Sequence, residues 1–429
     1  MKKLLALLLA IMLVFSLFAC GGGGDKDAAG GDDAATGGDT AGGDTAGGDT
    51  AGGDTAGGDT AGGDTAGGDF TAASGFAIRP SEMTVSDKTY RIAYVGFSWD
   101  NTVEHCADLM ENAFTKYLNC EFTALSSEGN PDTFIQNIEN YISQGYDALI
   151  CNVYSVTTGR ASELCAENDV IWMPVTAPAT DYDGNLVTPY VGVNDEYVGQ
   201  TLVQESYDWA VENWSDFATK DAYVYIIDVS SAEELHRRCV AMEAKAQELF
   251  PDAVKIEVGD SLAEGGGFSP EVAYNMCVRT FAANPDVKYW IVLHPFDYYV
   301  SGTCRAAEDY NIVDNVLTAC CNGDNYLPVL EDGTAGCWRF CLYWDNGLWG
   351  ELIACGLYAL VSEQCTAEQL WSDYIDEGTN YAGLRMAPVV MGPDNFSEVL
   401  GFYDNYLDYD YFGYKDKWQG TEFDIIVAK

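Results

Sequence analysis

The chain has 429 residues, of which 67 are acidic and 21 are basic, so its formal net charge is −46. This charge makes nucleic acid a poor partner and opposes contact with anionic membrane surfaces, because like charges repel. Acidic side chains occur throughout the sequence, so the acidity is a property of the folded part as well.

The first residues have the pattern of an export signal. Two lysines precede an apolar stretch at 4–18, which is followed by Ala19 and Cys20. This junction resembles the lipobox of bacterial lipoproteins, in which Cys20 would be lipidated and become the mature N-terminus. The alternative is an ordinary signal followed by a chance cysteine. We expect a lipoprotein signal peptide at 1–19 and a lipid anchor on the extracytoplasmic face of the cell membrane.

An acidic, glycine-rich arm follows. From Gly37 to Ala66 the pentad Gly-Gly-Asp-Thr-Ala repeats six times. A segment with no large apolar side chain cannot bury a core, so we expect a lipidated, disordered tether at 20–76. A flexible chain of about 55 residues has a root-mean-square span of roughly 40 Å.

Strand and helix patterns then alternate in two successive series. The first series predicts strands at 90–97, 121–127, 146–153 and 170–177, and helices at 102–118, 131–144 and 160–168. A further long helix is predicted after the segment "YVGVNDEYVG" and runs through Trp209. The second predicts strands at 221–230, 254–260, 287–294 and 315–321, and helices at 232–250, 270–283 and 301–310. Asn130, Pro131 and Gly145 supply a cap, a first turn and a stop for the second helix. Such alternation is typical of α/β units with mainly parallel sheets.

Fourteen cysteines raise the question of disulfides. Thirteen lie between Cys106 and Cys365, and no C-x-x-C pair occurs. Exported proteins often form disulfides, but several of these cysteines fall on helical apolar patterns, so we expect buried free thiols. We expect no metal site and no cofactor, because there are only three histidines and none has ligand spacing to a cysteine. The loop 181–185 is expected to be a turn, since it lacks the full ligand spacing of a calcium loop.

Several segments together point to a family. They are "RIAYVGFSWDN", "NPDTFIQNIENYISQGYDALIC", "TPYVGVNDEYVGQ", "ANPDVKYWIVL" and "TACCNGDN". They resemble the sugar-binding, ribose-binding-protein-like branch of type I periplasmic binding proteins, the solute receptors of ABC importers. The resemblance implies a two-lobed α/β fold, each lobe being a mainly parallel sheet flanked by helices. Lobe 1 would comprise 88–194 plus 346–373, and lobe 2 would comprise 195–345 plus 387–429, with a linker at 379–384.

The resemblance also implies a ligand site between aromatic rings and polar groups. Carried over by position, the ligand-binding residues would be Phe97, Trp99, Asp100, Asn101, Thr176, Asp195, Arg238, Phe296, Asp324 and Trp344. The family commonly has Asp-Arg where Thr176 and Ala177 stand, and glutamine near Trp344. These departures suggest a more aromatic pocket. We therefore expect an uncharged, partly apolar, hydroxyl-bearing ligand: a sugar or sugar derivative first, a nucleoside second.

Each candidate also has a structural alternative. Trp99 and Trp344 could be core aromatics, Asp100 and Asp195 could cap helices, and Arg238 could pair with a surface carboxylate.

The functional expectation is a monomeric receptor that delivers its ligand to an ABC permease. No G-x-S-x-G, G-x-x-x-x-G-K-[ST], H-E-x-x-H or G-x-G-x-x-G motif that would support an enzyme is present in a matching context, so no catalytic residue is assigned. The alternatives are a ligand-sensing receptor for a membrane signalling system and a nucleoside-binding lipoprotein. Transcription regulators with this type of ligand-binding fold carry a DNA-binding module before it. In this chain an export signal and a disordered arm occupy that place, which excludes the role of a transcription regulator.

Overall fold

The computed structural model describes residues 83–97, 101–154, 157–175, 177–230, 232–263, 269–386, 388–401 and 426–427. The predictions for the signal peptide, Cys20, the tether, Trp99, Asp100 and Thr176 lie outside these residues, and only the backbone of Asn101 is described. Within the described ranges, every helix is too short or too polar to cross a bilayer.

The first half of the chain builds a four-stranded parallel sheet in the order β2-β1-β3-β4. Its strands are β1 (Tyr90–Gly96), β2 (Cys120–Ser126), β3 (Ala148–Asn152) and β4 (Ile171–Val175). Ala93 of β1 lies opposite Thr123 on one side and Leu149 on the other. The predicted strands are therefore present, each within a few residues of its expected bounds.

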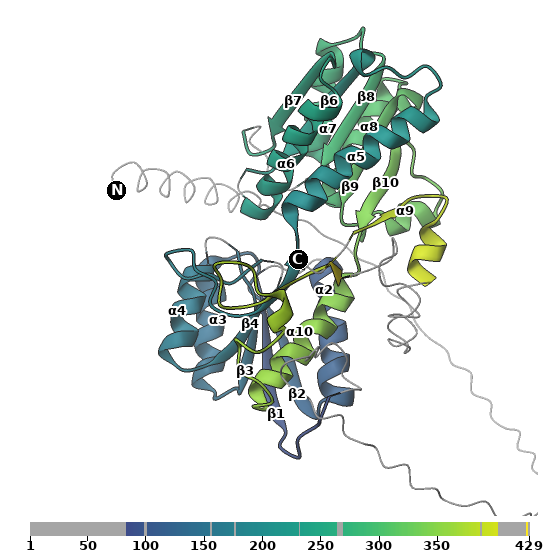
Figure 1. The fold of residues 1–429 in the computed structure, drawn as a ribbon. Coiled ribbons are helices and arrows are strands. Elements are labelled where there is room, and N and C mark those ends of the chain that lie inside the picture. Colours follow the sequence, from purple (N-terminus) through teal and green to yellow (C-terminus); the bar gives the residue numbers. More distant parts are fainter. Residues whose placement is uncertain are drawn as a thin grey trace, which may run out of the picture. The chain divides into compact units, whose positions relative to one another are not determined.

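Helices cover both faces of this sheet (Figure 1). They are α2 (Asn101–Asn112), α3 (Pro131–Ser143), α4 (Thr158–Glu167) and α10 (Asn346–Val361). Ile92 and Tyr94 point into the core shared with α2 and α10, whereas Ala93 and Val95 pack with α3 and α4. Burial on both faces explains why these strands are continuous apolar runs rather than alternating ones.

Helix α3 forms where its end signals predict it. The side chain of Asn130 accepts a hydrogen bond from the Thr133 amide at 2.9 Å, and Pro131 begins the helix. Gly145 follows the last turn at φ +70°, a backbone conformation that glycine adopts without steric cost. The prediction for this helix is confirmed.

Helix α2 is shorter than the expected helix at 102–118. It ends at Asn112, and Ala113–Tyr117 continue as a π-helical turn. The Thr115 hydroxyl donates to the Glu111 carbonyl at 2.7 Å within this wider turn. Apolar spacing alone cannot distinguish the two helix types, so the sequence prediction merges them.

The second half of the chain builds a six-stranded sheet in the order β12-β10-β9-β8-β6-β7. Its strands are β6 (Ala222–Asp228), β7 (Lys255–Asp260), β8 (Tyr289–His294), β9 (Val316–Cys321), β10 (Trp338–Tyr343) and β12 (Val389–Met391). All neighbours are parallel except β12, which runs antiparallel to β10. The strands of residues 90–175 and 222–321 thus lie in separate sheets.

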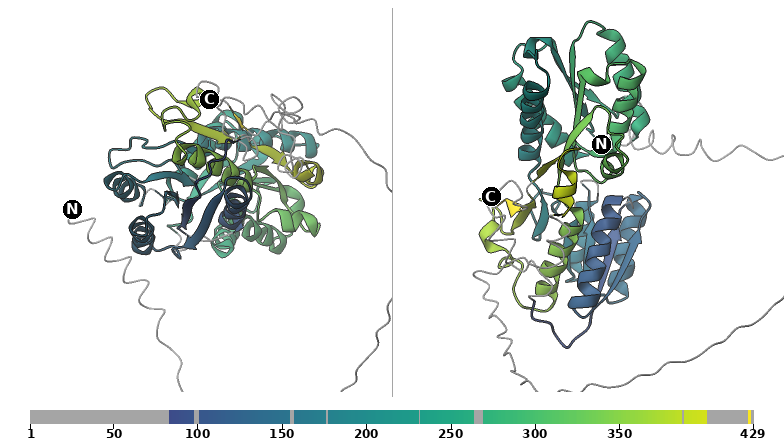
Figure 2. Two further views of the ribbon diagram at one scale, coloured as in Figure 1. Left: turned by 90° about the horizontal axis from the view of Figure 1, so that it is seen from below. Right: turned by 90° about the vertical axis from the view of Figure 1, so that its right-hand side faces the viewer.

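Two pairs of helices sandwich the second sheet, as two directions of view show (Figure 2). They are α5 (Asp195–Asn213) and α6 (Glu233–Leu249) on one face, and α7 (Pro270–Ala283) and α8 (Val300–Asp309) on the other. Val224 and Ile226 join the α5–α6 core, and Tyr223 and Tyr225 join the α7–α8 core. A short helix, α9 (Leu327–Glu331), follows β9.

A third, smaller sheet has the order β13-β11-β5. Its strands are β5 (Tyr190–Val193), β11 (Gly383–Met386) and β13 (Ile426–Val427). Strands β5 and β11 are parallel, and β13 is antiparallel to β11. Gly383 and Leu384 of the expected linker at 379–384 belong to β11 and pair with β5, and the linker itself stays a prediction.

The thirteen cysteines of the described chain are thiols rather than disulfides, and eleven of them are buried. Burial raises the pKa of Cys120 and of Cys165 to about 12. This packing agrees with the expectation that they serve as small apolar side chains.

Candidate functional site

The loops that follow β8, β9 and β10 meet at one edge of the six-stranded sheet. These strands are parallel neighbours, so their carboxyl ends lie on the same side. In open α/β sheets this edge is where ligands bind. The segments that leave it contain predicted site residues: Phe296 after β8, Asp324 after β9 and Trp344 after β10.

Arg238 lies at the centre of this edge. It is carried by α6 and is 6% exposed. Its Nε donates to Asp195 Oδ1 at 2.9 Å, and a terminal nitrogen donates to the Pro295 carbonyl at 2.9 Å. The guanidinium carbon lies 5.4 Å from the centre of the Trp344 ring, within the range of a cation–π contact. Three of the predicted residues are thus brought together.

The carboxylate of Asp195 is shared between two arginines. Its Oδ2 accepts a hydrogen bond from Arg237 at 2.9 Å, and the Arg237 side chain is 43% exposed. Asp195 does not cap α5. That role belongs to Asn194, whose side chain accepts from the Tyr197 amide at 3.0 Å. The pairing of Arg238 with a carboxylate was the structural alternative for this residue, but the pair is buried rather than on the surface.

Asp324 anchors a second polar cluster. Its Oδ2 accepts hydrogen bonds from the Thr102 hydroxyl at 2.8 Å, the Asn346 amide at 2.8 Å and the Asn322 amide at 3.4 Å. The same Asn346 amide donates to Asn322 Oδ1 at 2.8 Å, and Asn346 Oδ1 accepts from the Trp344 indole at 3.1 Å. This cluster joins the start of α2 to the ends of β9 and β10.

Two further acids flank these clusters. Asp345 caps α10 by accepting from the Leu348 amide at 2.9 Å, and its Oδ1 lies 3.8 Å from His105 Nε2. Burial raises the pKa of Asp345, while the His105 charge opposes that shift. Asp297 accepts from the Asn325 backbone and side-chain amides at 2.7 and 3.0 Å. Burial raises its pKa to about 7 in spite of those hydrogen bonds.

Phe97 lies at the end of β1, apart from the contacts just described. Its ring packs against Phe134 at 5.9 Å and Tyr154 at 5.0 Å between ring centres, and it is half-buried. Phe296 is also half-buried and precedes a short 3-10 turn. Whether either ring contacts a ligand stays a prediction, as it does for Trp344, whose ring is only 2% exposed.

Comparison with known proteins decides the class. A family model described as "Periplasmic binding protein domain" matches residues 92–364, well over half of the chain. The chain belongs to this family. Its members bind solutes outside the cytoplasm and are not enzymes. No match was found among curated proteins.

Solved structures share the fold at low sequence identity. A solute-binding protein of an ABC transporter from Bacillus halodurans C-125, with bound myo-inositol, is 14% identical with a TM-score of 0.56; the match covers 73% of this chain and 98% of that one. One from Agrobacterium vitis with bound α-D-tagatopyranose is 13% identical with a TM-score of 0.57, covering 72% and 96%. A fructose-binding periplasmic domain of a hybrid two-component system is 13% identical with a TM-score of 0.58, covering 74% and 95%.

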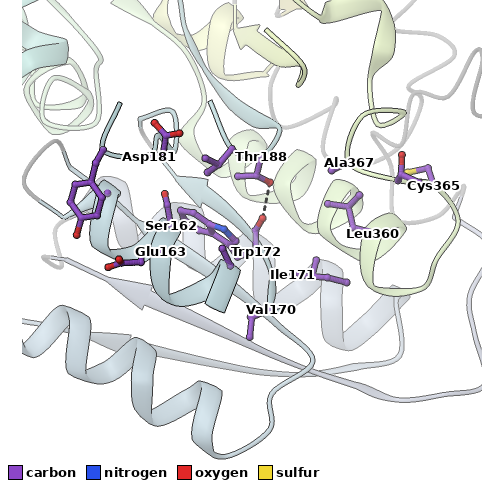
Figure 3. Close-up of a pocket in the computed structure, with 15 residues that line it drawn as sticks. Ser162, Glu163, Val170, Ile171, Trp172, Asp181, Thr188, Leu360, Cys365 and Ala367 are labelled. Atoms are coloured by element: carbon purple, nitrogen blue, oxygen red, sulfur yellow. Dashed lines mark hydrogen bonds between the residues drawn. The ribbon is translucent and has the colours of Figure 1, made fainter. Parts of the chain in front are cut away.

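A cavity of about 580 Å³ lies elsewhere on this periplasmic binding protein domain (Figure 3). Its walls come from α4, the start of β4, the segment 181–188, the end of α10 and the segment after it, and include Trp172, Leu360 and Cys365. The Thr188 hydroxyl donates to the Trp172 carbonyl at 2.9 Å along one wall. Because Val170 and Ile171 mark the amino end of β4, this cavity is not at the edge where the predicted site residues gather. The adjoining loop 181–185 is a turn closed on Asp181 Oδ1, as expected.

Sequence reasoning missed several residues of the strand-end clusters. They are Thr102, Asn322, Asn325, Asp345 and Asn346. The signal that could have found them is position, since each stands within a few residues of a strand end or a helix start. Among the described residues, no group of three histidine, cysteine or acidic side chains is arranged to hold a metal.

Proposed function

We propose that this protein is a lipid-anchored receptor that captures an uncharged, hydroxyl-bearing ligand, a sugar or sugar derivative first, and delivers it to an ABC permease. The observation that carries the proposal is the gathering of Asp195, Arg238, Asp324 and Trp344 at the carboxyl edge of parallel strands. The loop after β1, with Phe97, Trp99, Asp100 and Asn101, belongs to the same proposed site, as does Thr176 after β4.

The charge balance of the clusters supports a neutral ligand. The Arg238 guanidinium is already bonded to a carboxylate and a carbonyl, so it offers no uncompensated charge to an anion. Asp324 Oδ2 is bonded to a hydroxyl and two amides. A sugar hydroxyl can take the place of the Thr102 hydroxyl as a donor to Asp324 and at the same time accept from an asparagine amide. Buried partners left without such a hydroxyl are costly, which gives specificity.

The likeness to known proteins adds support at the level of class. The two ABC transporter proteins described above hold a cyclic polyol and a ketose. The two-component domain favours a second candidate, a receptor that reports to a membrane sensor. Both functions need a receptor with a ligand site between two lobes. We assign 88–194 plus 346–373 to the first lobe and 195–345 plus 387–429 to the second, in keeping with the separate sheets.

A ligand screen tests the proposal. The purified chain is melted in the presence of neutral sugars and polyols, nucleosides, amino acids and anionic metabolites. We expect the largest rise in melting temperature with a neutral sugar or polyol, and a nucleoside as second best. A best ligand that is phosphorylated or a dicarboxylate would contradict the proposed chemistry.

Variants then locate the site. Asp324→Asn replaces an acceptor by a partial donor and should weaken binding of the best ligand at least tenfold, which is about 1.4 kcal/mol. Asp332→Asn is the matched control, because Asp332 is an exposed acid that follows the short helix α9, on the other side of that helix from Asp324. Equal affinity of the two variants would place the ligand elsewhere. Cys20→Ala should release the protein into the medium, and its retention on the membrane would exclude the lipid anchor.

A further inference from the structure

Two cysteines of the second half of the chain lie close together. Cys304 is on α8, and Cys337 immediately precedes β10. Their sulfur atoms are 3.5 Å apart, at the distance of a thiol–thiol hydrogen bond. They are separated by 33 positions in the sequence, so the contact is made by the fold and not by chain proximity.

A disulfide between Cys304 and Cys337 would need the two sulfurs to approach further. A disulfide requires about 2.05 Å between sulfur atoms, so the gap to close is about 1.5 Å. Gly336 precedes Cys337 with φ +57°, in a turn where the Trp338 amide bonds the Ala335 carbonyl at 2.9 Å. A side-chain rotation at Cys304 together with a small shift of this turn would have to close this gap. The Thr318 amide donates a hydrogen bond to the Cys337 carbonyl at 2.9 Å, and this bond limits the shift of the turn.

The exposure of the two thiols differs. Cys304 is half-buried, whereas Cys337 is fully buried. The contact with the Cys337 thiol and burial raise the pKa of Cys304 well above its ordinary value, so Cys304 stays a protonated thiol in the absence of an oxidant. A small oxidant reaches Cys304 first, and Cys337 is then positioned to attack the sulfur of Cys304.

We propose that Cys304 and Cys337 form a site of oxidative modification, which closes to an intramolecular disulfide when the exported protein meets a disulfide oxidant. The proposal is independent of the ligand. It uses only the sulfur contact and the extracytoplasmic location of the family, a setting in which disulfides persist.

The reaction balances as two thiol–disulfide exchanges. Cys304 first loses its proton, and the resulting thiolate attacks one sulfur of the oxidant; a mixed disulfide forms and one small thiol leaves. The Cys337 thiolate then attacks Cys304 Sγ and expels the second small thiol. Two electrons pass from the cysteine pair to the oxidant disulfide, and the two thiol protons end on the two released thiols.

The bond would tie α8 to the amino end of β10. The opposite end of β10 leads directly into Trp344 and Asn346. Oxidation therefore fixes one end of the strand that carries part of the strand-end clusters.

Peptide mapping of the full chain tests the site. The protein is incubated with oxidised glutathione, denatured, alkylated and digested with trypsin and a glutamate-specific protease. These enzymes place Cys304 in the peptide 289–305 and Cys337 in the peptide 332–339, each without another cysteine. We expect these two peptides to be joined by a disulfide and to separate on reduction. A different pairing, or none, would overturn the proposal.

Three variants serve as a second readout. After oxidation, the unmodified chain and Cys365→Ala should each lose two titratable thiols, because Cys365 is a half-buried thiol outside the proposed pair. Cys304→Ala and Cys337→Ala should not lose that pair of thiols. If either variant loses two thiols, the bond lies elsewhere. The map of the unmodified chain remains decisive should a variant fail to fold.

Discussion

Replacing Arg238 by methionine should destabilise the protein far more than replacing its neighbour Arg237. Both arginines bond the same Asp195 carboxylate at 2.9 Å, but their side chains are 7% and 43% exposed, respectively. Methionine retains most of the side-chain volume, so the comparison isolates charge and hydrogen bonding. The two positions therefore form a matched pair that differs in burial.

The expected magnitudes follow from that difference. Removing one partner of a buried ion pair costs about 3–5 kcal/mol, because the other charge is left without compensation. Asp195 keeps its bond to Arg237, so we expect Arg238→Met to fall at the lower end, at about 3 kcal/mol. An exposed pair contributes about 0.2–1 kcal/mol, which is the loss expected for Arg237→Met.

Urea unfolding measures both values. The free energy of unfolding of each variant is compared with that of the unmodified chain, and Asp195→Asn completes a double-mutant cycle with Arg238→Met. Contacting residues commonly show coupling energies of about 0.5–3 kcal/mol, and we expect about 1.5 kcal/mol or more here. Losses for Arg237→Met and Arg238→Met that agree within about 0.5 kcal/mol would refute the assignment of a buried, structurally important pair.

Three further predictions concern pH, close packing and the first loop. In Asp297→Asn the pH dependence of stability should flatten. The folded carboxyl binds a proton as the pH falls below about 7, whereas the unfolded carboxyl does so only near its ordinary pKa of 3.8, so the unmodified chain gains up to about 4 kcal/mol of stability from this group between pH 7 and pH 4. Urea unfolding at each pH measures this gain, and an equal gain in the variant would contradict the argument. Gly350→Ala should lower the melting temperature, because a Cβ there would stand 2.2 Å from the Cys106 carbonyl oxygen. Gly401→Ala is the control and should be neutral, because no atom of the described residues lies within 4 Å of a Cβ at that position. Equal melting of the two variants would show that α2 and α10 can separate without cost. Trp99→Ala should weaken binding of an identified ligand by about 2 kcal/mol or more, measured by titration, while the melting temperature of the free protein changes little. A loss of stability of about 3–5 kcal/mol would instead show that this tryptophan is a core residue.

The sequence predicts strands β1–β4 and β6–β9 of the two larger sheets, for a physical reason, but not β5, β10 or β11. Strands buried on both faces, such as β3 and β8, are unbroken apolar runs that few other elements produce. Helix α3 is equally clear, because Asn130 and Gly145 mark both of its ends. The π-helical turn at 113–117 was not predicted, since its apolar spacing continues that of α2.

The candidate site was predicted in part. Asp195, Arg238, Asp324 and Trp344 do come together, as their positions after successive strands suggested. The hydrogen bond between Thr102 and Asp324 joins residues 222 positions apart, and no local pattern reveals such a partner. The burial of Arg238 was not predicted either. From the sequence, its alternative partner was a surface carboxylate, whereas in the structure Arg238 is paired with Asp195 in a buried position.

The small sheet of β5 and β11 has a mechanical consequence. Strand β5 leads from the four-stranded sheet into α5, and β11 leads towards β12 of the six-stranded sheet, so two crossings of the chain run side by side. Four register pairs bond them in parallel, from Gly383 opposite Tyr190 to Met386 opposite Val193. Two strands bonded along their length bend together and resist independent twisting. Any change in angle between the larger sheets should therefore concentrate its backbone rotation just beyond this ladder, at Asn194 and around Pro388, where a glycine substitution would make that rotation easier.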